Sequence, residues 1–192
     1  MNDVSKFRLS NVADTCSIWN LLASRVLYSA AKQVKITICC TQFVRYECLH
    51  KSGQVRPERH GLQQRLRHEI DIGDILCCTI DLEDLQDLGV LNQRKKVSKG
   101  ELASMIFAKR TVQAFMTDDS KAATLARSIM PADYVQSATH LIGWLYFTGR
   151  LQDSDKDRII RELNEFGRNL QPRLDEYYKE ALRCRLMAGS GF

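Results

Sequence analysis

Short apolar segments alternate with helical patterns along the first 150 residues of the chain. The apolar runs predict strands at 10–14, 34–40, 75–80, 112–116 and 133–137. The periodicity between them predicts helices at 17–24, 41–49, 58–70, 82–88, 98–110, 120–129 and 138–147. This alternation favours an α/β fold with a mostly parallel sheet of four to five strands flanked by helices.

The pattern changes after Leu151. Two amphipathic segments, 153–170 and 171–187, follow without a strand between them. We therefore expect an α/β domain at residues 1–151 and a C-terminal helical hairpin at residues 152–192. The first segment carries an apolar stripe at helical spacing, formed by Ile159, Ile160, Leu163 and Phe166. Packing of this stripe on the α/β domain is the expected outcome, and a partner or dimer groove is the alternative.

Composition is that of an ordinary globular protein. The 192 residues are 44% hydrophobic and 27% charged. The longest apolar run, 141–147, is far shorter than the roughly 20 residues that cross a bilayer. The polar N-terminal segment has no apolar region of a signal peptide. We expect a cytoplasmic protein with no membrane contact.

Cysteine and histidine spacing argues against zinc. There are seven cysteines, four of them in the vicinal pairs Cys39–Cys40 and Cys77–Cys78, and no C-x-x-C. The four histidines show no ligand spacing either. These cysteines are expected to be small, buried apolar residues.

Two predicted strands run into aspartate just before a helix. Asp14 ends the first, and Asp118 and Asp119 follow the strand at 112–116. A carboxylate at the end of a buried strand is costly unless a helix N-terminus, a cation or a metal receives it. Helix capping by Asp118, Asp119 or Ser120 explains one of the two neighbouring aspartates but not the pair.

Two predicted helices present a glutamate from their apolar faces. Glu47 shares a face with Phe43 and Val44 and lies too far into its helix to be a cap. Glu101 also lies on an apolar face, but it follows Ser98 in the pattern S-x-x-E of a capping box. Local sequence alone favours the cap for Glu101.

Together these acids predict one pocket. The carboxyl ends of parallel strands meet at one edge of a sheet, and inward helix faces can point to the same place. Four or five carboxylates there repel one another and need a cation, and hard oxygen ligands select Mg²⁺ or Mn²⁺ over zinc. A phosphodiester is the natural substrate, because a metal activates water and stabilises the charge that develops at phosphorus.

Four motifs in this order resemble those of the PIN-domain nucleases across residues 8–151. They are Val12-Ala13-Asp14-Thr15-Cys16, Glu47 in "FVRYE", Gly100-Glu101 with Ala108 seven residues on, and Thr117-Asp118-Asp119. Two features depart from the family pattern. Glutamate stands at the third acidic position, where many members carry aspartate, and the tail after Leu151 is longer than in compact toxins of this type.

The resemblance implies a three-layer PIN-like fold and a hydrolase, a metal-dependent endoribonuclease. It implies catalytic residues that also hold Mg²⁺ or Mn²⁺, namely Asp14, Glu47, Glu101 and Asp119. We expect Asp14 and Asp119 to be the central ligands. Supporting residues are Thr15, Ser17, Thr117 and Asp118, where Thr15 or Ser17 hydrogen-bonds a carboxylate or phosphate oxygen. Because the family includes VapC-type toxins, the expected partners are RNA, an antitoxin or other protein, and a second copy of the chain.

Other functions remain open at this stage. The same fold could cut DNA or a structured nucleic acid, or serve as a catalytically silent binding module. An acidic pocket at strand ends also suits a response-regulator-like or phosphatase-like protein. The net charge of +5 is a weak sign of a polyanion partner. Lys95, Lys96 and Lys99 are candidates for backbone contacts, with a solvated helix face as the alternative.

Overall fold

The computed structural model describes residues 2–50, 57–81 and 97–189. The predicted helix at 82–88, Lys95 and Lys96 lie outside these residues. The strands are β1 (Ser10–Ala13), β2 (Thr37–Thr41), β3 (Ile75–Cys78), β4 (Ala114–Met116) and β5 (Val135–Gln136). The helices before β4 are α1 (Thr15–Ala23), α2 (Arg25–Gln33), α3 (Gln42–Leu49), α4 (Pro57–Asp71) and α6 (Lys99–Arg110). Those after it are α7 (Ser120–Arg127), the 3-10 turn η1 (Ala132–Tyr134), α8 (Ala138–Phe147), α9 (Asp155–Glu165) and α10 (Gln171–Gly189).

The five strands form one parallel sheet in the order β3-β2-β1-β4-β5. This confirms the predicted α/β class. The chain builds outward from β1 to β3, then returns to the other side of β1 for β4 and β5. The carboxyl ends of β1 and β4 are therefore the point where the strand order reverses, which is where open α/β sheets bind ligands.

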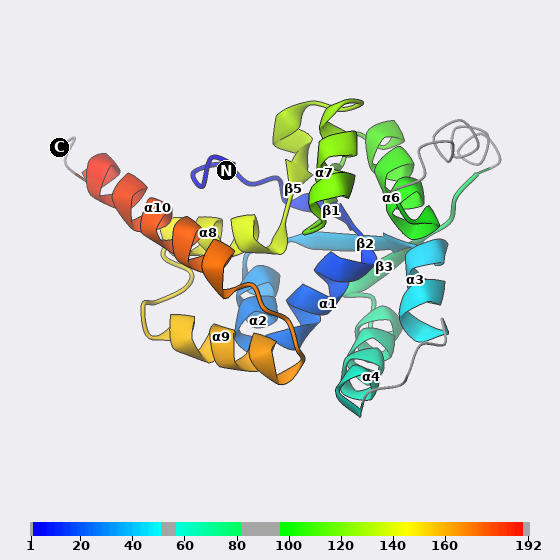
Figure 1. The fold of residues 1–192 in the computed structure, drawn as a ribbon, viewed down its shortest axis with the longest axis horizontal. Helices are drawn as coiled ribbons and strands as arrows, with labels where there is room; N and C mark the ends of the chain where they lie inside the picture. Colours follow the sequence, from blue (N-terminus) through cyan, green and yellow to red (C-terminus); the bar gives the residue numbers. More distant parts are fainter. Residues whose placement is uncertain (1, 51–56, 82–96, 190–192) are drawn as a thin grey trace.

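Helices cover both faces of the sheet, giving three layers (Figure 1). Helices α6 and α7 pack on one face, over Val12, Cys39 and Phe115. The other face carries α1, α2, α4, α8 and α9, and its core includes Ile38 and Met116. Successive strand residues point to opposite faces, so the continuous apolar runs supply both cores at once.

One helix was not predicted. Arg25–Gln33 forms α2, whose N-cap Ser24 accepts a hydrogen bond from the backbone N–H of Leu27 at 3.1 Å. Its buried residues are Leu27, Ala30 and Ala31, which face the same core as α1. Capping lets a second helix begin directly after α1, with a single residue between them.

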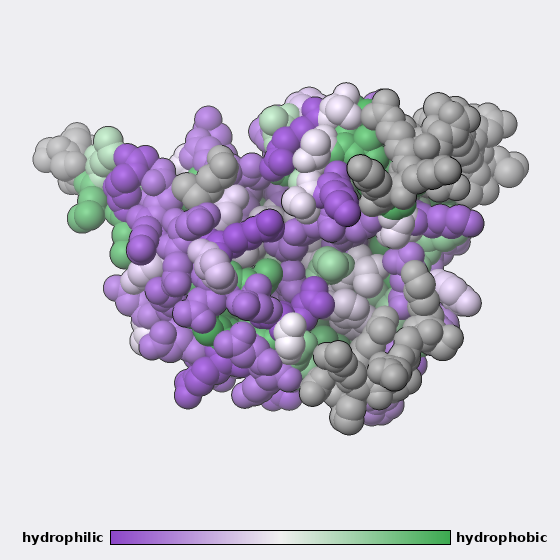
Figure 2. All heavy atoms as spheres, in the orientation of Figure 1, coloured by the Kyte–Doolittle hydropathy of each residue, from purple (hydrophilic) through white to green (hydrophobic). Residues whose placement is uncertain are grey.

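The C-terminal hairpin packs on the α/β part of the molecule, as expected. Ile159 and Leu163 of α9 are 0% and 1% exposed and join the core that α1 and α2 form. Helix α10 runs along α8 and buries Leu174 and Ala181 (Figure 1). The outer surface over these helices is mostly hydrophilic in Figure 2. Among the described helices, none is both long enough and apolar enough to span a bilayer.

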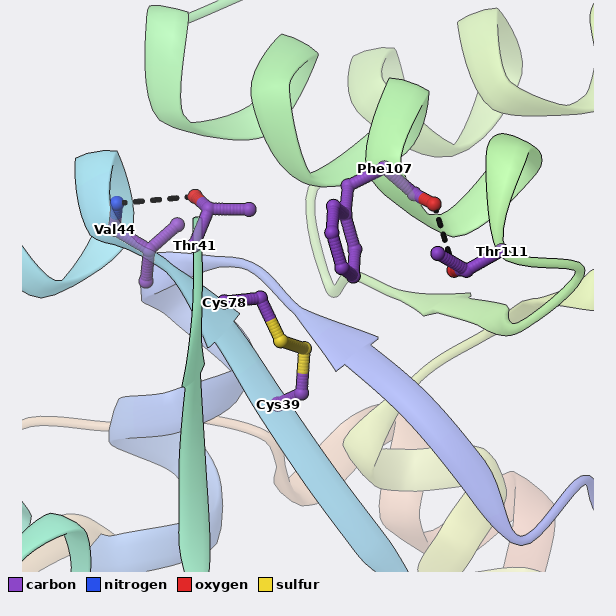
Figure 3. The surroundings of a disulfide bond; sticks show 6 residues. All are labelled: Cys39, Thr41, Val44, Cys78, Phe107 and Thr111. Carbon is purple, nitrogen blue, oxygen red and sulfur yellow. Dashed lines mark hydrogen bonds between the residues drawn. A yellow bond between two sulfur atoms is a disulfide. The ribbon is translucent and has the colours of Figure 1, made fainter. Parts of the chain in front are cut away.

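The cysteines depart in part from the prediction. Cys39, Cys40 and Cys48 are buried, but Cys77 is exposed. In addition, Cys39 of β2 is joined to Cys78 of β3 by a disulfide, with Phe107 of α6 nearby (Figure 3). The register pairs Thr41 with Cys78, so Cys39 is the diagonal neighbour of Cys78 on the same sheet face. Cross-strand register, which spacing does not reveal, places these two thiols together.

Candidate functional site

The site begins where β1 and β4 end side by side. Ala13 pairs with Met116, and the backbone N–H of Asp14 donates to the Met116 carbonyl at 3.0 Å. This register places Asp14 next to Thr117 and close to Asp118. The two predicted Asp-bearing strand ends therefore meet at the point where the strand order reverses.

Asp14 is fully buried and held by both of its carboxylate oxygens. Oδ1 accepts the backbone N–H of Ser17 at 2.7 Å, which makes Asp14 the N-cap of α1. Oδ2 accepts the hydroxyl of Thr117 at 2.5 Å. Burial raises the pKa of Asp14 from 3.8 to about 7, and the nearby charge of Asp118 adds to the rise. The hydrogen bonds from Thr117 and Ser17 oppose it only in part.

Asp118 turns inward toward α1 and the start of α8. Its Oδ2 accepts the side-chain amide of Asn20 at 2.8 Å, with longer contacts of 3.4 Å from the Ser17 hydroxyl and the Ala138 N–H. Its Oδ1 is buried and has no hydrogen-bond partner within the described part of the chain. Burial raises the pKa of Asp118 as well. A buried carboxylate oxygen without a donor is costly, and a ligand is one way to satisfy it.

The pair fits a divalent cation. The charges of Asp14 and Asp118 repel each other, which favours a shared positive charge, and Asp118 has a buried oxygen to offer. All donors are hard oxygens, the kind that Mg²⁺ and Mn²⁺ take. Within residues 2–50, 57–81 and 97–189, however, no three Asp, Glu, His or Cys side chains gather closely enough to hold a metal. The expectation that four or five carboxylates share one pocket therefore stays a prediction.

Glu47 is linked to the Asp14–Asp118 pair through Thr15. The hydroxyl of Thr15 donates to Glu47 Oε2 at 2.8 Å, and Thr15 directly follows Asp14. The carboxylate also packs on the backbone of Gly100 at the start of α6. A Cβ at this position would lie 2.7 Å from Oε2, so the approach requires glycine. Thr15 and Ser17 both contact carboxylates, as the sequence predicts, and their part in catalysis stays a prediction.

Glu101 and Asp119 each take part in capping a helix. Both halves of the capping box are present at α6, where Glu101 Oε2 accepts the Ser98 N–H at 2.7 Å and the Ser98 hydroxyl accepts the Glu101 N–H at 3.2 Å. Asp119 caps α7, because its Oδ1 accepts the N–H groups of Lys121 and Ala122 at 2.7 and 2.9 Å. Each carboxylate is thus directed to its own helix through one oxygen, and the role of either as a ligand stays a prediction.

Three site residues were missed by sequence analysis. Asn20, on α1, is 1% exposed and donates to Asp118. Arg168, between α9 and α10, donates through Nε to Asn20 Oδ1 at 2.7 Å, and Arg173 of α10 donates to the Asp118 carbonyl at 3.1 Å. The signal available in the sequence was an asparagine within the first predicted helix, six residues after Asp14. The arginines come from more than 140 residues later than α1, so no local pattern reveals them.

The predicted basic residues are mostly untested by the structure. Lys99 is exposed on the first turn of α6, beside Gly100, which contacts Glu47. Lys95 and Lys96 lie outside the described residues. Contact of all three with a nucleic-acid backbone remains a prediction.

Comparisons with models of protein families, with curated proteins and with solved structures give no match to this chain.

Proposed function

We propose that this protein is a Mg²⁺- or Mn²⁺-dependent endoribonuclease of the PIN-like kind, with Asp14 and Asp118 as its central metal ligands. The observation that carries the proposal is the pair of aspartates where the strand order reverses, in which Asp14 is buried and Asp118 has a buried Oδ1 without a donor. A cation beside this Asp118 oxygen would offset the negative charge of both aspartates. The carboxyl ends of β1 and β4 are also where open α/β sheets bind ligands.

The chain's own residues would hold and orient this site. Asp14 is fixed by the Ser17 N–H and the Thr117 hydroxyl, and Asp118 is fixed by Asn20. When bound, the cation supplies positive charge for the phosphoryl oxygens during in-line displacement. Glu47, reached through Thr15, stands where it can orient water at the edge of the pair.

Glu101 and Asp119 keep a smaller part in this proposal. Each uses one carboxylate oxygen in a cap, as Asp14 does, and unlike Asp118 neither has a buried oxygen without a donor in the described part of the chain. The sequence resemblance makes Asp119 a central ligand. The proposal gives that role to its neighbour Asp118 instead. The motif order and the observed α/β architecture both support the resemblance to PIN-domain nucleases. An antitoxin partner, as in VapC-type toxins, belongs to the same proposal.

A cleavage assay tests the proposal. Purified protein should cut single-stranded RNA with Mg²⁺ or Mn²⁺ and stop when EDTA is added. Asp14→Asn should abolish cutting, because it keeps the cap to Ser17 but removes the charge. Asp157→Asn, an exposed residue on α9, is the matched control and should cut like the wild type. Normal cutting by Asp14→Asn would refute the proposal. If the protein cut DNA and not RNA, DNA would take the place of RNA as the proposed substrate.

A further inference from the structure

A cavity of about 310 Å³ opens directly beside Asp118. It lies between α7, the start of α8 and the start of α10, and Asn2 also lines it. Its walls include two arginines from different helices, Arg127 at the end of α7 and Arg173 in the first turn of α10. Ser120, Ser137 and Thr139 add hydroxyl groups.

Neither arginine forms a close ion pair. Within residues 2–50, 57–81 and 97–189, Arg127 and Arg173 have no carboxylate oxygen within 4.0 Å, although the charge of Arg173 does act on the Asp118 carboxylate. Arg173 donates one N–H to the Asp118 carbonyl at 3.1 Å, which fixes its direction and leaves other N–H groups of the guanidinium for a ligand. The guanidinium fork matches the oxygens of a phosphate group.

Acidic residues also border this cavity, but two of them are directed elsewhere. The Asp118 carboxylate turns to Asn20, and the Asp119 carboxylate caps α7. Glu176, three residues after Arg173, is exposed. With a divalent cation on the aspartate pair, the local charge becomes favourable for an anion next to Asp118.

We propose that this cavity binds a phosphate of the nucleic-acid strand next to the phosphate that is cut, through Arg127 and Arg173. This inference rests on the proposed nuclease function. The cavity shares Asp118 with the cation site, so a strand whose scissile phosphate meets the cation would bring a neighbouring phosphate to the arginines. The C-terminal hairpin then forms part of the substrate site rather than a mere brace for the α/β domain.

The first measurement needs no nucleic acid. Inorganic phosphate in Mg²⁺ buffer should raise the melting temperature of the wild type. The shift should be lost in Arg127→Gln and Arg173→Gln and kept in Lys179→Gln, which removes an exposed charge from the same helix α10. An equal phosphate shift in all four proteins would overturn the phosphate site, whether or not the protein is a nuclease.

The second measurement identifies the source of the phosphate. Binding of a single-stranded 2′-O-methyl RNA is titrated in Ca²⁺ over a range of salt. Each arginine variant should lower the slope of log affinity against log salt by about 0.7, the value for one released counterion on a single strand. Lys179→Gln should leave the slope unchanged. If Arg127→Gln and Arg173→Gln show the same salt dependence of affinity as the wild type, the arginines do not contact a phosphate of the strand, even if RNA is bound and cut.

The two proposals fail in different ways. RNA cleavage with unchanged arginine variants refutes only the phosphate site. A phosphate shift that depends on both arginines, without any nucleic-acid binding, supports an oxyanion site and refutes its role on a nucleic-acid strand together with the nuclease function.

Discussion

The β1–α1 and β4–α7 junctions share one sequence pattern and reach different structures. In each, an apolar strand runs into aspartate and a helix follows, and Asp14 and Asp119 both accept N-cap hydrogen bonds. Asp14 is 0% exposed, however, whereas Asp119 is partly exposed. Asp118 is also partly exposed as a residue, but its Oδ1 is buried, and it is the aspartate of this junction that does not cap.

This difference teaches that a cap and a buried site have separate causes. Capping depends on residues within one turn, so both junctions achieve it. Burial depends on position in the sheet. β1 is the central strand, with α1 in the layer below it, and that layer also receives the Asp118 carboxylate through Asn20. Under the proposed function, the comparison favours Asp14, which also caps α1, and Asp118 as the ligand pair, and leaves Asp119 as the cap of α7.

The largest expected effect separates the two neighbouring aspartates. Asp118→Asn should lower RNA cleavage by about a thousandfold or more, the order of loss seen when a transition-state electrostatic contact is removed. Asp119→Asn should stay within about tenfold of wild type, because asparagine still caps a helix. Single-turnover cleavage rates in Mg²⁺ measure both. A greater loss in Asp119→Asn would return the central role to Asp119.

The stabilisation of the protein by Mn²⁺ should distinguish the two proposed ligands, Asp14 and Asp118, from Asp119. Mn²⁺ at a hundredfold above its dissociation constant should stabilise the wild type by about 2.7 kcal/mol. This corresponds to roughly 5–10 °C in melting temperature for a chain of this size. Asp14→Asn and Asp118→Asn should lose most of the shift, and Asp119→Asn should keep it. Equal shifts in all four proteins would show that the pair does not hold the metal.

The metal-free protein should lose stability as pH rises. The pKa of Asp14 is higher in the folded protein, about 7, than its ordinary value of 3.8. The folded state therefore binds more protons between these values, and the free energy of unfolding falls as pH rises from about 4 through 7. Each unit of pKa difference is worth about 1.4 kcal/mol. Urea unfolding in EDTA at pH 5 and pH 8 should show a smaller fall in Asp14→Asn. An unchanged fall would contradict the raised pKa.

A substitution at Gly100 extends the comparison to Glu47. Gly100→Ala would push its Cβ against the Glu47 carboxylate, which has to move. We expect cleavage to fall about a hundredfold, the lower end for a general acid or base. Stability should hold or rise slightly, since alanine favours a helix. Unchanged cleavage, with the shift of Glu47 verified in a structure, would exclude Glu47 from the site.

The smallest effect is expected at the capping box of α6. Glu101→Gln keeps a group that can accept the Ser98 N–H, so stability should change by less than about 0.5 kcal/mol. Cleavage should also stay near wild type if Glu101 is only a cap. A folded Glu101→Gln without activity would instead make Glu101 a ligand, as the sequence resemblance implies.

The sequence predicts the layers of this fold well and its site only in part. Buried parallel strands are continuous apolar runs, so the strands at β1 to β4 are visible in the sequence. Asp14, Asp118 and Asp119 are visible for the same reason, as polar residues that end such runs. Which aspartate turns inward depends on Asn20 and on Arg168, which reaches it across 148 positions. The Cys39–Cys78 pair likewise depends on strand register, not on spacing.

Two arginines beside the site come late in the sequence, Arg168 in the turn before α10 and Arg173 in α10 itself. A ribosome therefore adds them after the rest of the site. Both aspartates, Asn20 and the whole sheet are synthesised before Arg168 and Arg173 exist. At about 5–20 residues per second, a nascent chain spends seconds with the acidic pair but without the arginines that hold Asn20 and line the cavity. Under the proposed function, the part of the substrate site that Arg173 supplies is therefore completed only late in translation.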